Sequence, residues 1–236
     1  MLMEIYGKVS AYCRGLLDSN RYFYDCVIND NGFGIFFIDE PDGYSKIYLY
    51  NCLLAYIRSK GFIALTTASS DIASLLMPGG RTAHFQFKIL LITDENTLCN
   101  FTKQKHLAQL LHLTKLIIWN KISIINRQAI ETLNQSLKDI MKNNLLFGCK
   151  IFVFGGNFQQ VLLVIPQETC AQIVNTSFKK SYLWSIIEIF YLYKNMRVEN
   201  NDSSDNFVNL LLKIGNRTEQ TINEDMIKIP DQIVVP

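Results

Sequence analysis

The stretch FFIDEPDGYSKIYLY, residues 36–50, sets the expected fold. It reads as an apolar strand (Phe36–Ile38), a polar turn (Asp39–Ser45) and a helix that begins at Lys46. A strand that passes through a tight turn into a helix is the outline of a phosphate-binding loop, where backbone N–H groups at a helix N-terminus hold phosphates. That motif requires Gly, four residues, then Gly-Lys-Ser/Thr. This chain instead has Glu40, four residues, then Ser45-Lys46-Ile47.

The composition predicts a globular intracellular protein. Of 236 residues, 49% are hydrophobic and 19% are charged, which is enough to bury a sizeable core. The net charge of +2 is too small to indicate nucleic-acid binding by itself. Six scattered cysteines without a C-x-x-C pair predict reduced thiols. The N-terminus has no basic segment followed by an apolar one, so secretion is not expected. No apolar run reaches the roughly 20 residues of a membrane helix, so no membrane partner is expected.

Apolar strands alternate with amphipathic helices along the chain. Short apolar runs predict strands at 62–66, 115–119, 150–154, 161–165 and 186–192. Apolar spacings of three and four predict helices within 1–35 and at 46–60, 103–113, 127–142 and 207–214, and a shorter one capped by Ser69 or Ser70. Strands that are apolar throughout are typical of a sheet buried on both faces. The pattern therefore predicts an α/β fold, with a mostly parallel sheet and helices on both faces.

Five blocks appear in order: FFID…PDGYSKIYLY, LTTASSDIASLLMPGGRTAHFQFKI, KLIIWNK, IFVFGGNFQQVLLVIP and YKNMR. From about residue 20 onwards they resemble the petite-integration-frequency (PIF) ATP-dependent DNA helicases, particularly the form carried by Helitron-type transposons. The resemblance implies a RecA-like P-loop domain at 1–199, the first of the family's two motor domains, with a degenerate P-loop at 39–47. A polar break, a short helix and a truncated tail are expected at 200–236. A second motor domain would have to come from an unknown partner.

The resemblance implies ATP and Mg²⁺ as cofactors. Asn20 stands where the family has a glutamine that reads adenine. In the P-loop Pro41, Gly43 and Lys46 agree with the family, whereas Ser45 replaces a glycine. Ile47 replaces the threonine whose hydroxyl binds magnesium.

The resemblance also assigns the catalytic positions. Asn120-Lys121 stands where the family has the Asp-Glu pair that binds magnesium and orients water. Gln160, with Asn157, stands in the motif that senses the γ-phosphate, and Arg197 keeps the arginine after the sixth strand. Ile47 and Asn120 are thus the family's metal positions, and neither is intact.

These departures oppose ATP hydrolysis, because phosphoryl transfer depends on positioning and charge neutralisation. Glu40 and Asp42 place carboxylates where glycines would let the backbone approach phosphates. One like-charge contact at about 4 Å costs about 4 kcal/mol at an effective dielectric of 20. Lys121 has the opposite charge to the carboxylate it replaces. Two interpretations remain: drift at a disused site, or Lys121 replacing the metal's charge so that nucleotide binds without metal.

Single-stranded DNA is the partner that the resemblance implies, through Thr67, Ser69, Ser70 and His84. His84-Phe85 is consistent with a platform beneath a base and equally with a packed loop. Basic residues near this block would either line a groove along the DNA backbone or be scattered surface charges: Arg81, Lys88, Lys103 and Lys105.

The function that the resemblance implies is ATP-dependent DNA unwinding in repair, recombination and telomere maintenance, in the nucleus. For this copy we expect little or no ATPase activity. The alternative is a non-enzymatic pseudo-helicase or transposon remnant that binds single-stranded DNA weakly at most. Many of the departures need only one G-to-A or C-to-T change, which favours a decaying copy. A P-loop kinase is disfavoured, because it has no reason to carry the TASS…GGRTAH block.

Other constellations predict no further chemistry. The spacing of His106 and His112 does not place both rings on one helix face, which favours a surface pair over a metal site. Trp119 and Trp184 adjoin apolar strands, so we expect them in the core rather than stacked on bases.

Overall fold

The computed structural model describes residues 33–39, 46–90, 99, 105–158, 169–192, 210, 213–214, 221–223 and 226–227. Two predictions lie outside these residues, namely the strand at 161–165 and the boundary at 199/200. Of the helical region predicted within 1–35, only residues 33–35 are described. The chain divides into two compact units, Met1–Lys194 and Asn195–Pro236. In the second unit, β7 (Thr221–Asn223) and β8 (Met226–Ile227) pair in antiparallel fashion. The described residues of the helix predicted at 207–214, namely 210, 213 and 214, are helical.

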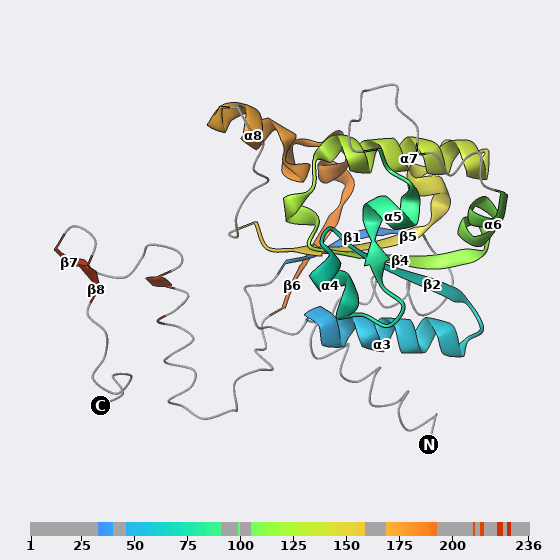
Figure 1. Ribbon diagram of the computed structural model, residues 1–236, viewed down its shortest axis with the longest axis horizontal. Coiled ribbons are helices and arrows are strands. Elements are labelled where there is room, and N and C mark those ends of the chain that lie inside the picture. Colours follow the sequence, from blue (N-terminus) through green and yellow to red (C-terminus); the bar gives the residue numbers. More distant parts are fainter. Residues whose placement is uncertain are drawn as a thin grey trace, which may run out of the picture. The chain divides into compact units, whose positions relative to one another are not determined.

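The first unit is built on a six-stranded sheet with the order β3-β2-β4-β5-β1-β6 (Figure 1). Every neighbouring pair in this sheet is parallel. The strands are β1 (Ile35–Asp39), β2 (Ile63–Ala68), β3 (Arg81–Thr82), β4 (Thr114–Asn120), β5 (Ile151–Gly156) and β6 (Glu188–Tyr191). The prediction of a mostly parallel sheet is therefore confirmed.

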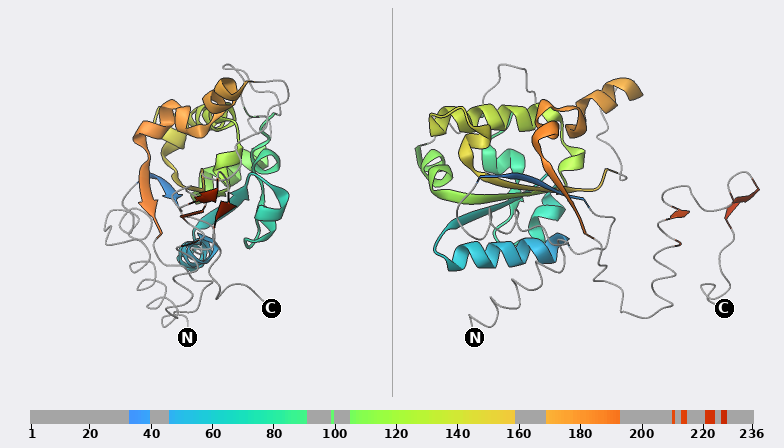
Figure 2. Two further views of the ribbon diagram at one scale, coloured as in Figure 1. Left: turned by 90° about the vertical axis from the view of Figure 1, so that its left-hand side faces the viewer. Right: turned by 180° about the vertical axis from the view of Figure 1, so that it is seen from behind.

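Helices cover both faces of this sheet, as predicted (Figure 2). Within the described residues of the first unit, the α-helices are α3 (Lys46–Ser59), α4 (Asp71–Leu75), α5 (Ala83–Phe87), α6 (Lys105–Leu113), α7 (Arg127–Met141) and α8 (Cys170–Thr176). Short 3₁₀ turns are η2 (Ile122–Ile124), η3 (Leu146–Cys149), η4 (Phe178–Lys180) and η5 (Tyr182–Ile186). In Figure 1 the long helices α3 and α7 lie on opposite sides of the sheet.

Alternation along the strands divides the core between the two faces. In β1, Phe36 and Ile38 join the apolar cluster under α3, whereas Ile35 and Phe37 join the cluster under α7. Successive strand side chains point to opposite faces, so a strand buried on both sides must be apolar throughout. This is the physical reason why the unbroken apolar runs in the sequence predicted a covered parallel sheet.

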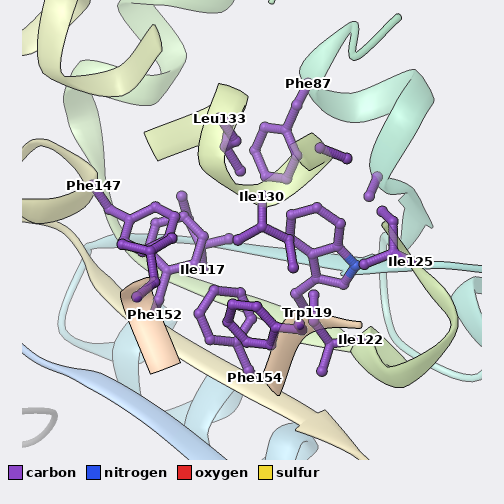
Figure 3. Close-up of a cluster of buried hydrophobic side chains, with 14 of the residues drawn as sticks. Phe87, Ile117, Trp119, Ile122, Ile125, Ile130, Leu133, Phe147, Phe152 and Phe154 are labelled. Atoms are coloured by element: carbon purple, nitrogen blue, oxygen red, sulfur yellow. The ribbon is translucent and has the colours of Figure 1, made fainter. Parts of the chain in front are cut away.

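The cluster under α7 is rich in aromatic rings, several of which Figure 3 shows. Phe154 lies 5.3 Å from Phe152 and 5.3 Å from Phe178 between ring centroids. Trp119 is fully buried beside Phe87, at 5.7 Å. Trp184 packs against the same cluster. The prediction that both tryptophans belong to the core is confirmed.

Among the described strands and α-helices of the first unit, three short elements were not predicted. The edge strand β3 has two residues, and α5 has five, so neither is long enough to show a periodic pattern. The helix α8 begins with a capping box in which Thr169 and Gln172 satisfy each other's backbone N–H groups. That Thr-x-x-Gln spacing is a signal that sequence reasoning could have used. Among the described residues, no helix is long and apolar enough to cross a membrane.

Candidate functional site

The carboxyl ends of the parallel strands lie side by side, and the line that they form across the sheet is called the sheet edge below. Five residues stand next to one another in register along it: Thr82, Ala68, Asn120, Gly155 and Ile38. In open parallel α/β sheets, ligands bind outside this edge, because the loops that follow the strands meet there. The described residues that the sequence assigned to nucleotide or DNA binding lie at or next to this edge, which makes it the candidate site.

Asn120 ends β4 and is only 4% exposed. Its carboxamide oxygen accepts a hydrogen bond from the backbone N–H of Lys121, at 2.9 Å. Lys121 adopts a left-handed backbone conformation (φ 56°), which turns the chain sharply at the end of the strand. That oxygen belongs to a neutral amide, so Asn120 is a weaker ligand for a cation than a carboxylate would be.

Ile47 lies in the first turn of α3 and packs against the apolar cluster under that helix. Magnesium requires oxygen ligands in octahedral geometry, and an aliphatic side chain supplies none. Because Asn120 is also a neutral and therefore weaker ligand, the two metal positions do not fit Mg²⁺. Within the described ranges, no three His, Cys, Asp or Glu side chains gather as a metal site, and His106 and His112 are both exposed on α6.

Lys46 begins α3 at the sheet edge, in the position predicted for the P-loop lysine. Its Cδ lies 3.5 Å from where a Cβ on Gly155 would stand. Tyr50, one turn further along α3, is fully buried, and its hydroxyl occupies the space that the same Cβ would need. The absence of a side chain at Gly155 thus lets the first turn of α3 lie directly against the end of β5.

Asp39 begins the predicted P-loop range 39–47, but sequence reasoning gave it no role of its own. It ends β1, opposite Gly156 of β5. Burial raises the pKa of its carboxyl group, and the nearby positive charges of Lys179 and Lys46 oppose that rise. Lys179 comes from η4, and its ammonium lies 4.4 Å from the ring centroid of Phe158. No motif marks Lys179, because only the fold brings it to β1.

Ser123 is a second residue that sequence reasoning missed. It lies in η2, is 3% exposed, and its hydroxyl has no hydrogen-bond partner among the described residues. Its Oγ would lie 3.4 Å from a Cβ on Gly156. Ser123 is therefore a buried polar group beside the end of β5. An apolar neighbourhood (Ile122, Ile124, Ile125) hid it in the sequence.

Three of the predicted DNA-contacting residues follow or end β2. Thr67 is fully buried, and its hydroxyl donates to the carbonyl of Ile118 at 3.2 Å. Ser69 accepts a hydrogen bond on its hydroxyl from the indole N–H of Trp119, at 3.0 Å. Ser70 caps α4, accepting from the N–H of Ala73 at 3.3 Å. All three hydroxyls thus have structural partners, and contact with DNA remains a prediction.

His84 lies on α5 and is half-buried, and burial lowers its pKa, so the neutral imidazole is favoured. The next residue, Phe85, points outward and is 55% exposed. Asn157, after β5, is 8% exposed. The remaining predicted site residues lie outside the described residues: Asn20, Pro41, Gly43, Ser45, Gln160 and Arg197. Their assignments remain predictions.

Comparisons of the sequence with known proteins indicate one family. The family model described as "PIF1-like helicase" matches residues 18–225. The chain is 28% identical over 172 residues to the ATP-dependent DNA helicase Pif1 of Psychrobacter sp. (strain PRwf-1), which covers 72% of this chain and 26% of that protein. The chain thus spans about a quarter of the length of this curated relative.

The solved structures with a similar fold include Pif1 helicases. The Pif1 helicase from Bacteroides in complex with ADP-AlF3 and ssDNA superposes with a TM-score of 0.70 at 21% identity, over 87% of this chain and 47% of that one. The Pif1 helicase from Candida albicans gives a TM-score of 0.68 at 22% identity, over 92% and 50%. The fold is thus that of a RecA-like helicase domain, and the chain spans about half the length of these proteins. Since the family model matches most of its residues, the chain belongs to the PIF1-like helicase family.

Proposed function

We propose that this chain is the first motor domain of a PIF1-like DNA helicase whose nucleotide site no longer hydrolyses ATP, and that it retains binding to single-stranded DNA. In an intact family member, the expected activity is ATP-driven unwinding in DNA repair, recombination and telomere maintenance. Because the chain spans only part of its relatives, unwinding would require a second motor domain. We propose that an unknown partner would supply this second domain.

The observation that carries the loss of hydrolysis is the packing of Ile47 against the core in the first turn of α3, where the resemblance implies a metal-binding threonine. Phosphoryl transfer requires a bound metal and an oriented attacking water. At the end of β4 this chain offers a neutral amide oxygen and a lysine, whose charge is wrong for holding a cation or accepting a proton.

Binding to single-stranded DNA is supported by the placement of the loops after β2 and β3. Ser69 and Ser70 follow β2, and His84 follows β3, which pairs with β2 at the sheet edge. The Bacteroides relative with this fold was solved in complex with ssDNA. We propose that Thr67, which is fully buried, shapes this loop from below through its bond to Ile118 rather than touching DNA itself.

An ATPase assay in the presence of single-stranded DNA tests the loss of hydrolysis. The Psychrobacter relative serves as the active reference, and Lys46→Ala is the matched inactive variant of this chain. We expect phosphate release by the wild-type chain to equal that of Lys46→Ala, with and without DNA. Turnover that depends on DNA and disappears in Lys46→Ala would show that the site is active.

A titration with fluorescent ATP in EDTA tests the alternative, in which Lys121 replaces the metal's charge. If Lys121 has that role, nucleotide binds without Mg²⁺ and Lys121→Ala abolishes binding. We expect no binding at millimolar nucleotide in either protein, because the sequence has Glu40 and Asp42 where the family's P-loop has glycines, and acidic residues there would repel phosphates. Metal-independent binding that requires Lys121 would replace our proposal of a disused site with one of a modified site.

A further inference from the structure

Phe85 is a large aromatic side chain that the fold presents to solvent beside two positive charges. Its ring is 55% exposed. The guanidinium carbon of Arg81 lies 5.4 Å from the ring centroid, and the ammonium nitrogen of Lys88 lies 4.0 Å from it. Among the described residues, Phe85 is thus an exposed ring within cation–π distance of two basic side chains that flank it in sequence.

The backbone holds this arrangement in place. Arg81 belongs to β3, where it stands opposite Thr67 of β2. In α5, Ala83 and Phe87 are fully buried in the cluster under α7, so the short helix is anchored and directs Phe85 outward. Lys88 ends the helix in a left-handed conformation (φ 50°), which reverses the chain and returns its side chain toward the ring. The ring and its two cations therefore sit on a fixed support.

An exposed ring beside two cations is a combination that binds single-stranded nucleic acid. Bases stack on aromatic faces, and lysine and arginine neutralise the phosphates on either side. A cation–π contact at an exposed site is weak, so a base that stacks on the ring can displace one cation toward a phosphate. The position also suits this ligand, because the loop containing Ser69 and Ser70 follows the strand that pairs with β3.

We propose that Phe85 is a base-stacking platform for single-stranded DNA, with Arg81 and Lys88 binding the backbone phosphates of the stacked nucleotide and its neighbour. This inference rests on the single-stranded DNA binding proposed above, and it names the contact that supplies affinity without reading sequence. From the sequence alone, Phe85 was equally consistent with a packed loop and with a stacking platform. The exposed ring and its two cations favour the platform.

The chain offers a matched control in Phe62. This phenylalanine is 39% exposed, and the ammonium of Lys115 lies 5.5 Å from its ring centroid. It precedes β2, so it lies at the amino end of the sheet, away from the proposed DNA path. Phe62→Ala therefore removes an exposed ring with a neighbouring cation but should leave DNA binding unchanged.

The test is fluorescence anisotropy of the full chain with labelled oligo(dT), measured over a range of salt concentrations. We expect Phe85→Ala to weaken binding about 10-fold, within the range for loss of one stacked base, and Phe85→Trp to retain it. Phe85→Leu, which keeps an apolar side chain without an aromatic face, should behave like Phe85→Ala. Arg81→Gln and Lys88→Gln should each reduce the slope of log affinity against log salt by about 0.7.

An oligomer of abasic deoxyribose phosphates separates stacking from charge. With this probe, wild type and Phe85→Ala should bind with equal affinity, because no base is present to stack. If wild type binds oligo(dT) but Phe85→Ala and Phe85→Leu bind equally well, the platform is refuted and DNA binding stands. A loss that persists on the abasic probe also refutes it. If wild type does not bind oligo(dT) at all, both this inference and the proposed DNA binding fail.

Discussion

The hydrogen bond between Trp119 and Ser69 joins the buried core to the loop that follows β2, and its removal gives a quantitative test. The indole N–H donates to the serine hydroxyl at 3.0 Å, and Trp119 is fully buried. In Ser69→Ala the indole keeps its burial but loses this acceptor. A buried donor left in this way costs about 1–3 kcal/mol, so we expect the free energy of unfolding to fall by about 2 kcal/mol.

The same substitution should cost much less when the donor has already gone. Trp119→Phe removes the indole N–H and destabilises the protein through lost packing. In that background Ser69→Ala should lower the free energy of unfolding by less than about 0.5 kcal/mol, because no buried donor is left unsatisfied. The difference between the two backgrounds, at least about 1.5 kcal/mol, measures the coupling of the two residues.

Urea unfolding followed by far-ultraviolet circular dichroism measures all four proteins, with the slope against urea checked for constancy. Ser185→Ala is the control, because that serine is exposed and its hydroxyl donates to the carbonyl of Tyr182 at 3.0 Å. Its effect should stay within about 0.5 kcal/mol. Equal costs of Ser69→Ala in the two backgrounds would refute the reasoning, because they would show that the bond to Trp119 contributes nothing.

Three further predictions concern the core and the sheet edge. Phe154→Ala should lower the free energy of unfolding by about 4 kcal/mol, because the ring is fully buried among other rings. Gly155→Ala should lower the free energy of unfolding by about 1–3 kcal/mol, because the new Cβ meets the Tyr50 hydroxyl. Adding Tyr50→Phe should recover part of this loss, because it removes the hydroxyl and leaves Cζ, at 2.9 Å, as the nearest atom of that ring. Because burial raises the pKa of Asp39, its ionised form is disfavoured in the folded state. Asp39→Asn should therefore be more stable than wild type at pH 7, with the difference shrinking as the pH falls towards the ordinary aspartate pKa of about 3.9.

Each of these has its own check by denaturant unfolding. Phe62→Ala is the exposed counterpart of Phe154→Ala, and a similar loss in both would contradict the burial argument. For Gly155→Ala, additive effects with Tyr50→Phe would show that the two side chains do not compete for space. For Asp39→Asn, a stability difference that stays constant between pH 7 and pH 3 would show that ionisation of Asp39 is not its cause.

The sequence alone was sufficient for the fold class, because the signal is local. Residues of a strand buried on both faces must all be apolar, and the runs in β1, β4 and β5 meet that condition. The alternation with long amphipathic helices such as α7 then required parallel strands. Sequence blocks in a fixed order indicated the family, and the family model agrees. The elements β3, α5 and α8 were too short to show a period, although the capping box at Thr169 marked the start of α8.

The candidate site was also predictable only in part, because only some of its features follow from local sequence. The residues at 46, 47, 120 and 121 could be assigned to the site from the sequence, because each lies at the start of a helix or at the end of a strand. Tertiary structure decided what surrounds these side chains: Ile47 packs against the apolar cluster under α3. It also decided that Lys179 reaches Asp39 from a distant turn, and that Arg81 and Lys88 flank an exposed Phe85. Local patterns determine which faces are buried, whereas contacts between residues far apart in the chain depend on strand order and register, which no short stretch of sequence encodes.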